Sequence, residues 1–104
     1  MVPSEAAERF TPRLITTLPY VAEAVTTGRV ELQVEQEHGR PVTAGFYANI
    51  GENPFRVALV GVDGRTTAEH TLPVGSTIQI SCAISRVIVA PIEAQEATYQ
   101  VYGY

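Results

Sequence analysis

The feature that most constrains the fold is a series of short strand-like runs separated by turn signals at intervals of about 8–12 residues, which is typical of all-β sandwiches and barrels. Residues 29–35 show the pattern most clearly, because Val30, Leu32 and Val34 alternate with charged or amide side chains. A period of two places each set on its own face of a strand. We therefore predict a half-buried strand here, with its glutamates in water.

Further runs of strand-forming residues follow along the chain. They are residues 42–50, 55–62, 65–72, 77–84, 86–90 and 97–104. Asp63-Gly64, between two of these runs, predicts a two-residue hairpin with a type I′ turn. Together the runs predict an all-β fold, a small antiparallel β-sandwich of about seven strands that is Ig-like or jelly-roll-like and spans residues 29–104.

The inward positions of these strands predict the hydrophobic core. Its expected members are Val30, Leu32, Val34, Phe46, Ile50, Val57, Leu59, Ile78, Ile80, Ile84, Val87, Val89, Tyr99 and Val101. Cys82, the only cysteine, falls on the same face as Ile80 and Ile84. A free cysteine behaves as a small hydrophobe, so we expect it to be buried.

Residues 1–28 do not follow the strand pattern and are predicted to form an N-terminal arm that packs along the sandwich or onto a neighbouring subunit. Ser4 is a candidate cap for a short helix that Pro12 would end. Residues 13–18 favour an edge strand, and residues 19–25 fit either a turn of helix or extended chain. The first residues carry two glutamates and no apolar stretch, so no secretory signal is expected.

Composition excludes several classes of function. The 104 residues indicate a single domain, and the net charge is −4. All the basic residues are isolated arginines, so no patch is expected to bind nucleic acid. No apolar run approaches the ~20 residues that span a membrane. The absence of lysine excludes Schiff-base chemistry and a P-loop.

The residues that could carry catalysis lack the spacing that catalysis needs. His38 and His70 stand far apart, in no metal-binding motif. Glu31 and Glu35 would lie about 13 Å apart on one strand, too far for a glycosidase pair. The serines lack a nucleophile-elbow pattern. We therefore expect a non-enzymatic protein with no catalytic residue, no metal site and no cofactor.

Aromatic residues give a better indication of function. Tyr99 is expected to face inward, which leaves Tyr102 and Tyr104 together on the opposite face as an amphipathic contact surface. The alternative is that they cover the sheet edge or pack on the arm. Tyr47 is a further exposed candidate. The predicted interface residues are Phe10, Leu14, Tyr20, Tyr47, Tyr102 and Tyr104.

The C-terminal third resembles the closing strands of small β-sandwich structural proteins of tailed bacteriophages. The resemblance rests on Leu72-Pro73-Val74-Gly75 leading into an alternating strand, on Ile84–Val89, and on the terminal Tyr99–Gly103 with its aromatic-glycine pair. It implies a capsid decoration, neck or tail component located in the virion. Such a protein would form homo-oligomers and bind other virion proteins, with its N-terminal arm on neighbouring subunits.

Two other functions remain open. The same stretch is also similar to the end of a carbohydrate-binding jelly roll, whose aromatic side chains stack on sugars. Tryptophan is absent, so Tyr47, Tyr102 and Tyr104 would take that role in an extracellular or cytoplasmic soluble module. Two or three coplanar aromatic rings about one sugar apart would indicate glycan binding. A cupin-like enzyme would need a His/Glu metal cluster that the sequence does not supply.

Overall fold

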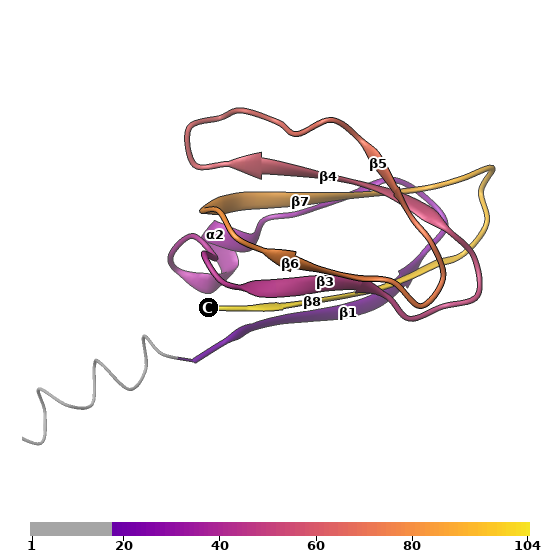
Figure 1. The fold of residues 1–104 in the computed structure, drawn as a ribbon, viewed down its shortest axis with the longest axis horizontal. Helices are drawn as coiled ribbons and strands as arrows, with labels where there is room; N and C mark the ends of the chain where they lie inside the picture. The colour runs from indigo at the N-terminus through magenta and orange to yellow at the C-terminus, as the bar shows by residue number, and fades with distance from the viewer. Residues whose placement is uncertain (1–17) are drawn as a thin grey trace, which may run out of the picture.

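Residues 18–104, which the computed structural model describes, form two four-stranded antiparallel sheets packed against each other (Figure 1). The first sheet has the order β1 (Tyr20–Thr26), β8 (Ala97–Gly103), β3 (Gly45–Asn49) and β6 (Thr77–Ile80). The second sheet has the order β2 (Val30–Leu32), β7 (Ile84–Pro91), β4 (Phe55–Gly61) and β5 (His70–Leu72). The predicted small all-β sandwich is confirmed.

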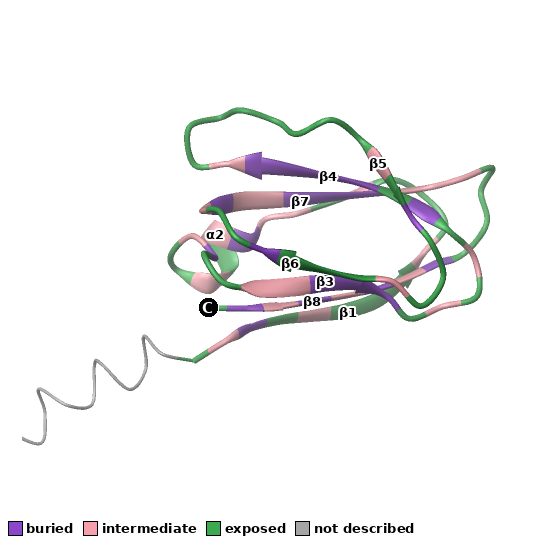
Figure 2. Ribbon diagram, viewed as in Figure 1, coloured by how far each residue is buried: buried purple, intermediate pink, exposed green. Residues whose placement is uncertain are grey.

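The core lies between the sheets, where one face of each strand is turned away from water. Figure 2 shows the buried residues concentrated along β4, β7 and β8. Each fully buried aliphatic or aromatic side chain contributes about 1.5–3 kcal/mol. Predicted core residues that are buried are Val34, Val57, Leu59, Ile80, Ile84, Val87, Val89, Tyr99 and Val101. Val30 and Leu32 are partly buried and pack against them.

Strand β3 has the opposite register from the one predicted. Phe46 and Ile50 were expected in the core, but Phe46 is half-buried on the outer face and Ile50 is exposed. Tyr47, expected to be exposed, is buried between Val101 and Ile78 on the inner side. A shift of one residue moves every side chain to the other face. Adjacent aromatic residues fit either face, so alternation alone could not select the register.

The run predicted as one strand over residues 77–84 is divided between the sheets. β6 ends at Ile80 in the first sheet, and β7 begins at Ile84 in the second. Cys82 lies in the crossing segment and is exposed, so the prediction that it is buried is wrong. Ile78 shares the inner side with Tyr47, but its position on an edge strand leaves it 36% exposed.

The first predicted strand ends earlier than expected because a short helix follows it. α2 (Val34–His38) buries Val34 completely and is followed by Gly39, whose φ of 90° forms a left-handed C-cap. Glu35 and Glu37 lie in its first turn, where they complement the helix dipole. These are helix signals that the strand-like alternation of residues 29–35 concealed.

The turn after β4 differs from the predicted type I′ hairpin. Gly64 N–H donates to Gly61 O at 3.0 Å, and Gly61 N–H donates to Arg65 O at 2.8 Å. Only Gly64 has a positive φ in this turn, at 83°. This is a three-residue loop with a glycine bulge. The returning chain makes a single bridge, from Thr66 to Val60, before β5 begins at His70.

Part of the segment predicted as an arm is a strand of the first sheet. All seven residues of β1 pair with β8. Tyr20, at the start of β1, joins the core cluster. Phe10 and Leu14 lie outside the described residues.

Candidate functional site

The strongest candidate site is an aromatic cluster on the outer face of the first sheet, formed by Phe46, Tyr102 and Tyr104. β3 and β8 place Phe46 directly opposite Tyr102, so their side chains share a face. Their rings stack with centroids 5.6 Å apart and planes 19° apart. Tyr104 meets Tyr102 edge to face at 5.9 Å.

The phenols of the cluster form a hydrogen bond with each other. The two hydroxyl oxygens of Tyr102 and Tyr104 are 3.2 Å apart. This bond, with a smaller effect of burial, raises the pKa of Tyr102. The Tyr102 hydroxyl is therefore neutral at physiological pH and offers hydrogen bonds without charge.

Beside the cluster lies an open cleft of about 410 Å³. Its lining consists of Ala44, Gly45, Phe46, Thr77, Gln79, Tyr102 and Tyr104. The cleft reaches from the aromatic rings to β6, the edge of the sheet. It combines apolar walls with neutral hydrogen-bonding groups.

The apolar surface continues onto β1. Val21 is opposite Tyr102 and is 58% exposed, and Val25 on the same face is 56% exposed. Glu23 stands between them, and its carboxylate accepts a hydrogen bond from Gln100 at 3.3 Å. Glu23 is the one charged side chain that β1, β8, β3 and β6 place on this face.

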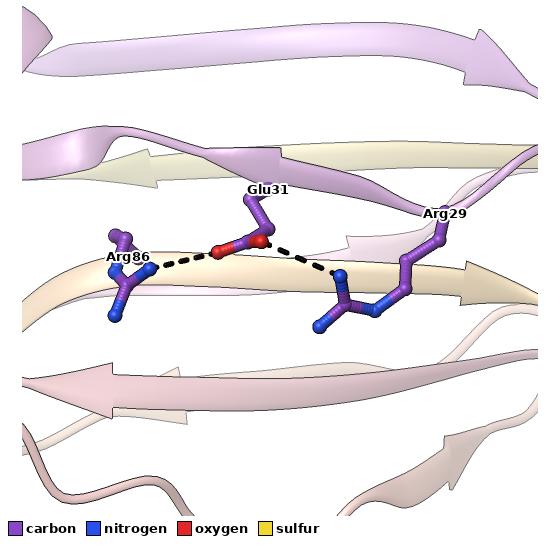
Figure 3. Close-up of polar contacts among 3 residues, drawn as sticks. All are labelled: Arg29, Glu31 and Arg86. Atoms are coloured by element: carbon purple, nitrogen blue, oxygen red, sulfur yellow. Dashed lines mark hydrogen bonds and ion pairs between the residues drawn. The ribbon is translucent and has the colours of Figure 1, made fainter.

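The outer face of the second sheet has a different character. Glu31 accepts from Arg29 at 3.3 Å and from Arg86 at 2.8 Å, so one carboxylate bridges two guanidinium groups (Figure 3). Arg56 and Glu69 form another pair at 3.6 Å. Exposed ion pairs of this kind remain hydrated and add little stability. The two outer faces therefore differ, and the first sheet presents the surface suited to apolar contact.

Two predicted interface residues are buried. Tyr20 is 6% exposed and donates its hydroxyl to Glu37 Oε1 at 2.9 Å, linking β1 to α2. Burial and then this hydrogen bond raise the pKa of Tyr20. Tyr47 is 4% exposed, and burial raises its pKa as well. Both hydroxyls have hydrogen-bond partners within the fold, Glu37 for Tyr20 and His70 for Tyr47, whereas Tyr102 and Tyr104 lie on the outer face as predicted.

Phe46 and Val21 are the residues that sequence reasoning missed. Phe46 is predicted in the core, and Val21 belongs to residues 19–25, which fit either a turn of helix or extended chain. Their role follows from the pairing of β1 and β3 with β8, which places both beside Tyr102. Strand pairing between distant segments leaves no signal in a single sequence.

Two other clefts lie elsewhere on the surface. One of about 540 Å³ borders Tyr20, Glu37, His38 and Arg40 where the described chain begins. Burial and then the charge of Arg40 lower the pKa of His38. The other, of about 390 Å³, lies beside the turn at residues 61–67 and includes Cys82. The first cleft contains the hydrogen bond from Tyr20 to Glu37, which links β1 to α2. Among the described residues, neither cleft contains a cysteine, serine or threonine side chain hydrogen-bonded to a histidine or a carboxylate.

Over residues 18–104, no three His, Cys, Asp or Glu side chains are grouped so that they could hold a metal ion. In the same range, no helix has the length and apolar character needed to cross a membrane.

Comparison with known proteins adds no relationship: the chain matches no protein-family model, and no curated protein or solved structure shows detectable similarity to it.

Proposed function

We propose that the chain is a non-enzymatic assembly protein, a structural component of a virion, that binds neighbouring subunits through its N-terminal arm and the outer face of the first sheet. The observation that carries the proposal is the aromatic cluster, which continues into the exposed valines of β1. Exposed apolar surface of this kind on a small domain marks an interaction site. Its partners would be further copies of the chain and other virion proteins.

The position of β1, the part of the arm that the structure describes as a strand, supports the same proposal. The arm enters the first sheet through β1, whose Val21 contacts the row of residues that contains Tyr102 and Phe46. β1 and the apolar surface therefore lie on the same sheet, and residues 1–17 precede β1 directly in the sequence. A partner that contacts one is well placed to contact the other.

The alternative, a glycan-binding module, has less support from the ring geometry. Sugar binding uses the open face of an aromatic ring, and a platform needs coplanar rings side by side. Phe46 and Tyr102 instead stack on each other, and Tyr104 stands at 89° to Tyr102. The rings cover one another's faces, an arrangement more useful for packing against a protein.

The test is the native mass of the full chain, measured by size-exclusion chromatography with light scattering. The wild-type chain is expected to form an oligomer. Val21→Asp places a charge in the apolar surface and should weaken association about tenfold or more, since a desolvated unpaired charge is costly. Val62→Asp is the matched control, because Val62 is 54% exposed but lies in the turn after β4.

The control variant should retain the wild-type mass, and both variants should keep a cooperative thermal transition. A monomeric wild-type chain at all concentrations would overturn the proposal. Equal masses for the wild-type chain and both variants would show that the outer face of the first sheet takes no part in association. Binding of a glycan array with loss on Tyr102→Ala would favour the alternative.

A further inference from the structure

β6 forms an edge of the first sheet. Half of its backbone N–H and C=O groups lie on the free side of the strand and point away from β3. Asn49 N–H donates to Ser76 O at 3.0 Å, which sets the phase of the ladder between β3 and β6. Hydrogen bonds alternate along an antiparallel pair, so the backbone N–H and C=O groups of Ile78 and Ile80 point toward β3. The N–H and C=O groups of Thr77 and Gln79 therefore point outward in the plane of the sheet, away from β3. Within residues 18–104 these outward groups have no backbone partner.

β6 also lacks the charged residues and the proline that usually protect an edge strand. Natural sheets block edges with charged residues, proline or very short strands. β1 carries Glu23 and β2 carries Glu31, while β5 has three residues bounded by Glu69 and Pro73. β6 reads Thr-Ile-Gln-Ile, without charge or proline, and its first three residues are exposed. Of the described edges, it is the one most open to another strand.

Apolar surface lies on both sides of this edge. Ile78 is 36% exposed on the inner side. On the outer side is the cleft beside Phe46 and Tyr102, whose lining includes Thr77 and Gln79. A strand added to β6 would alternate its side chains between these two surfaces. The edge thus offers backbone pairing together with apolar contacts for consecutive side chains.

The arm has the composition and position to supply that strand. Residues 13–17 read Arg-Leu-Ile-Thr-Thr, with an adjacent apolar pair and β-branched residues that favour extended chain. The arm joins the sheet at β1, which is the opposite edge from β6. Donor and acceptor are therefore different surfaces, and a contact between different surfaces links copies head to tail.

We propose that residues 13–17 of one copy add as a strand to β6 of a neighbouring copy, so that copies associate head to tail. This inference rests on the proposed function, in which the arm binds a neighbouring subunit. It names the surface on which the arm binds. Repetition of the contact produces a ring where the rotation closes and a filament where it does not.

Cys82 provides a native probe for this contact. It is exposed and follows the last residue of β6 by two positions. A second cysteine is introduced into the arm of the full chain, as Thr11→Cys or Thr17→Cys, one for each direction of pairing. Copper-phenanthroline with air oxidises neighbouring thiols to disulfides. Non-reducing electrophoresis should show a ladder of dimers, trimers and larger species, because every copy both donates an arm and accepts one.

Each outcome of the cross-linking is decisive. A ladder from either variant that disappears with Cys82→Ser supports the proposal. Dimers alone would indicate reciprocal exchange, and an intrachain disulfide would place the arm on its own β6. Either result, or no cross-link from both variants, would overturn head-to-tail association.

Proline substitution separates this inference from the proposed function. Gln79→Pro removes an outward N–H and no hydrogen bond to β3, so it blocks the edge. It should reduce the ladder about tenfold, the effect of losing one hydrogen bond together with strand alignment. Gln79→Ala is the matched control, and thermal melting checks that both variants fold. If Gln79→Pro does not fold, Thr77→Pro takes its place. If the Gln79→Pro variant forms the same oligomer as the wild-type chain, the proposal that the arm binds β6 is wrong, but the proposed assembly function is not contradicted. A monomeric wild-type chain would contradict the assembly function itself.

Discussion

At the scale of single residues, Asn49 makes the most demanding set of polar contacts. It is 1% exposed and lies on β3 of the first sheet. Its Nδ2 donates to Leu72 O at 3.0 Å and to Asn53 O at 2.9 Å, and its Oδ1 accepts from Gly51 N–H at 3.0 Å. Because Leu72 belongs to β5, this side chain joins the two sheets. Buried amides are tolerated only when they are satisfied in this way.

Asn49→Asp should therefore destabilise the fold strongly. The carboxylate would replace the donor and face two carbonyl oxygens, at a cost of about 3–5 kcal/mol for an unpaired buried charge. Asn53→Asp is the matched control, because Asn53 donates only to Glu96 O at an exposed position. Its cost should stay below about 1 kcal/mol. Urea unfolding at neutral pH measures both, and similar losses for the two variants would contradict this account of Asn49.

At the scale of elements, pairing with β8 determines which face of β3 is buried. Tyr47 lies opposite Val101 and donates or accepts a 2.8 Å hydrogen bond with His70 Nε2 on β5. Phe46 lies opposite Tyr102 on the outer face. In this register Gly45 meets the backbone of Tyr102 and Gly103 so closely that a Cβ would not fit. The absence of a side chain at Gly45 is thus a condition for this pairing.

Paired substitutions test the register. Tyr47→Ala should cost about 3–5 kcal/mol, because it removes a buried ring and its hydrogen bond between the sheets. Phe46→Ala should cost about 1 kcal/mol, since its ring is half-buried. Chemical unfolding of the two variants gives the comparison. A larger loss of unfolding free energy for Phe46→Ala than for Tyr47→Ala would favour the register predicted from the sequence.

The sequence was informative where a strand has one apolar face and uninformative where both faces are apolar or aromatic. Alternation correctly placed Val57, Val87 and Val101 inside. It failed at Phe46-Tyr47, where adjacent rings suit either face. For the candidate site, it predicted that Tyr102 and Tyr104 share the outer face. The other members, Phe46 and Val21, are brought there by strand pairing across long sequence separations, which no local pattern encodes.

At the scale of the whole molecule, three tyrosines are buried in a chain that contains no lysine. Tyr20, Tyr47 and Tyr99 are each 4–7% exposed, and burial is the first cause that raises the pKa of each. Glu37 also contributes for Tyr20 and Tyr99, since its carboxylate opposes a second negative charge. The folded state therefore holds these phenolic protons more tightly than the unfolded chain does.

This difference predicts unfolding in alkali. A pKa raised on folding stabilises the protein at every pH below the unfolded value of about 10. As the pH rises above that value, the unfolded chain releases its phenolic protons first, and stability falls by up to about 1.4 kcal/mol per pH unit for each tyrosine. The arginines stay charged throughout this range and do not offset the loss.

Urea unfolding from pH 8 to pH 12 should give a flat region and then a steep decline. Tyr47→Phe, which keeps the ring and removes one titrating group, should make that decline shallower by at most about a third. An equally steep decline in the variant would show that Tyr47 ionises as readily in the folded protein as in the unfolded chain, and would contradict its burial between the sheets.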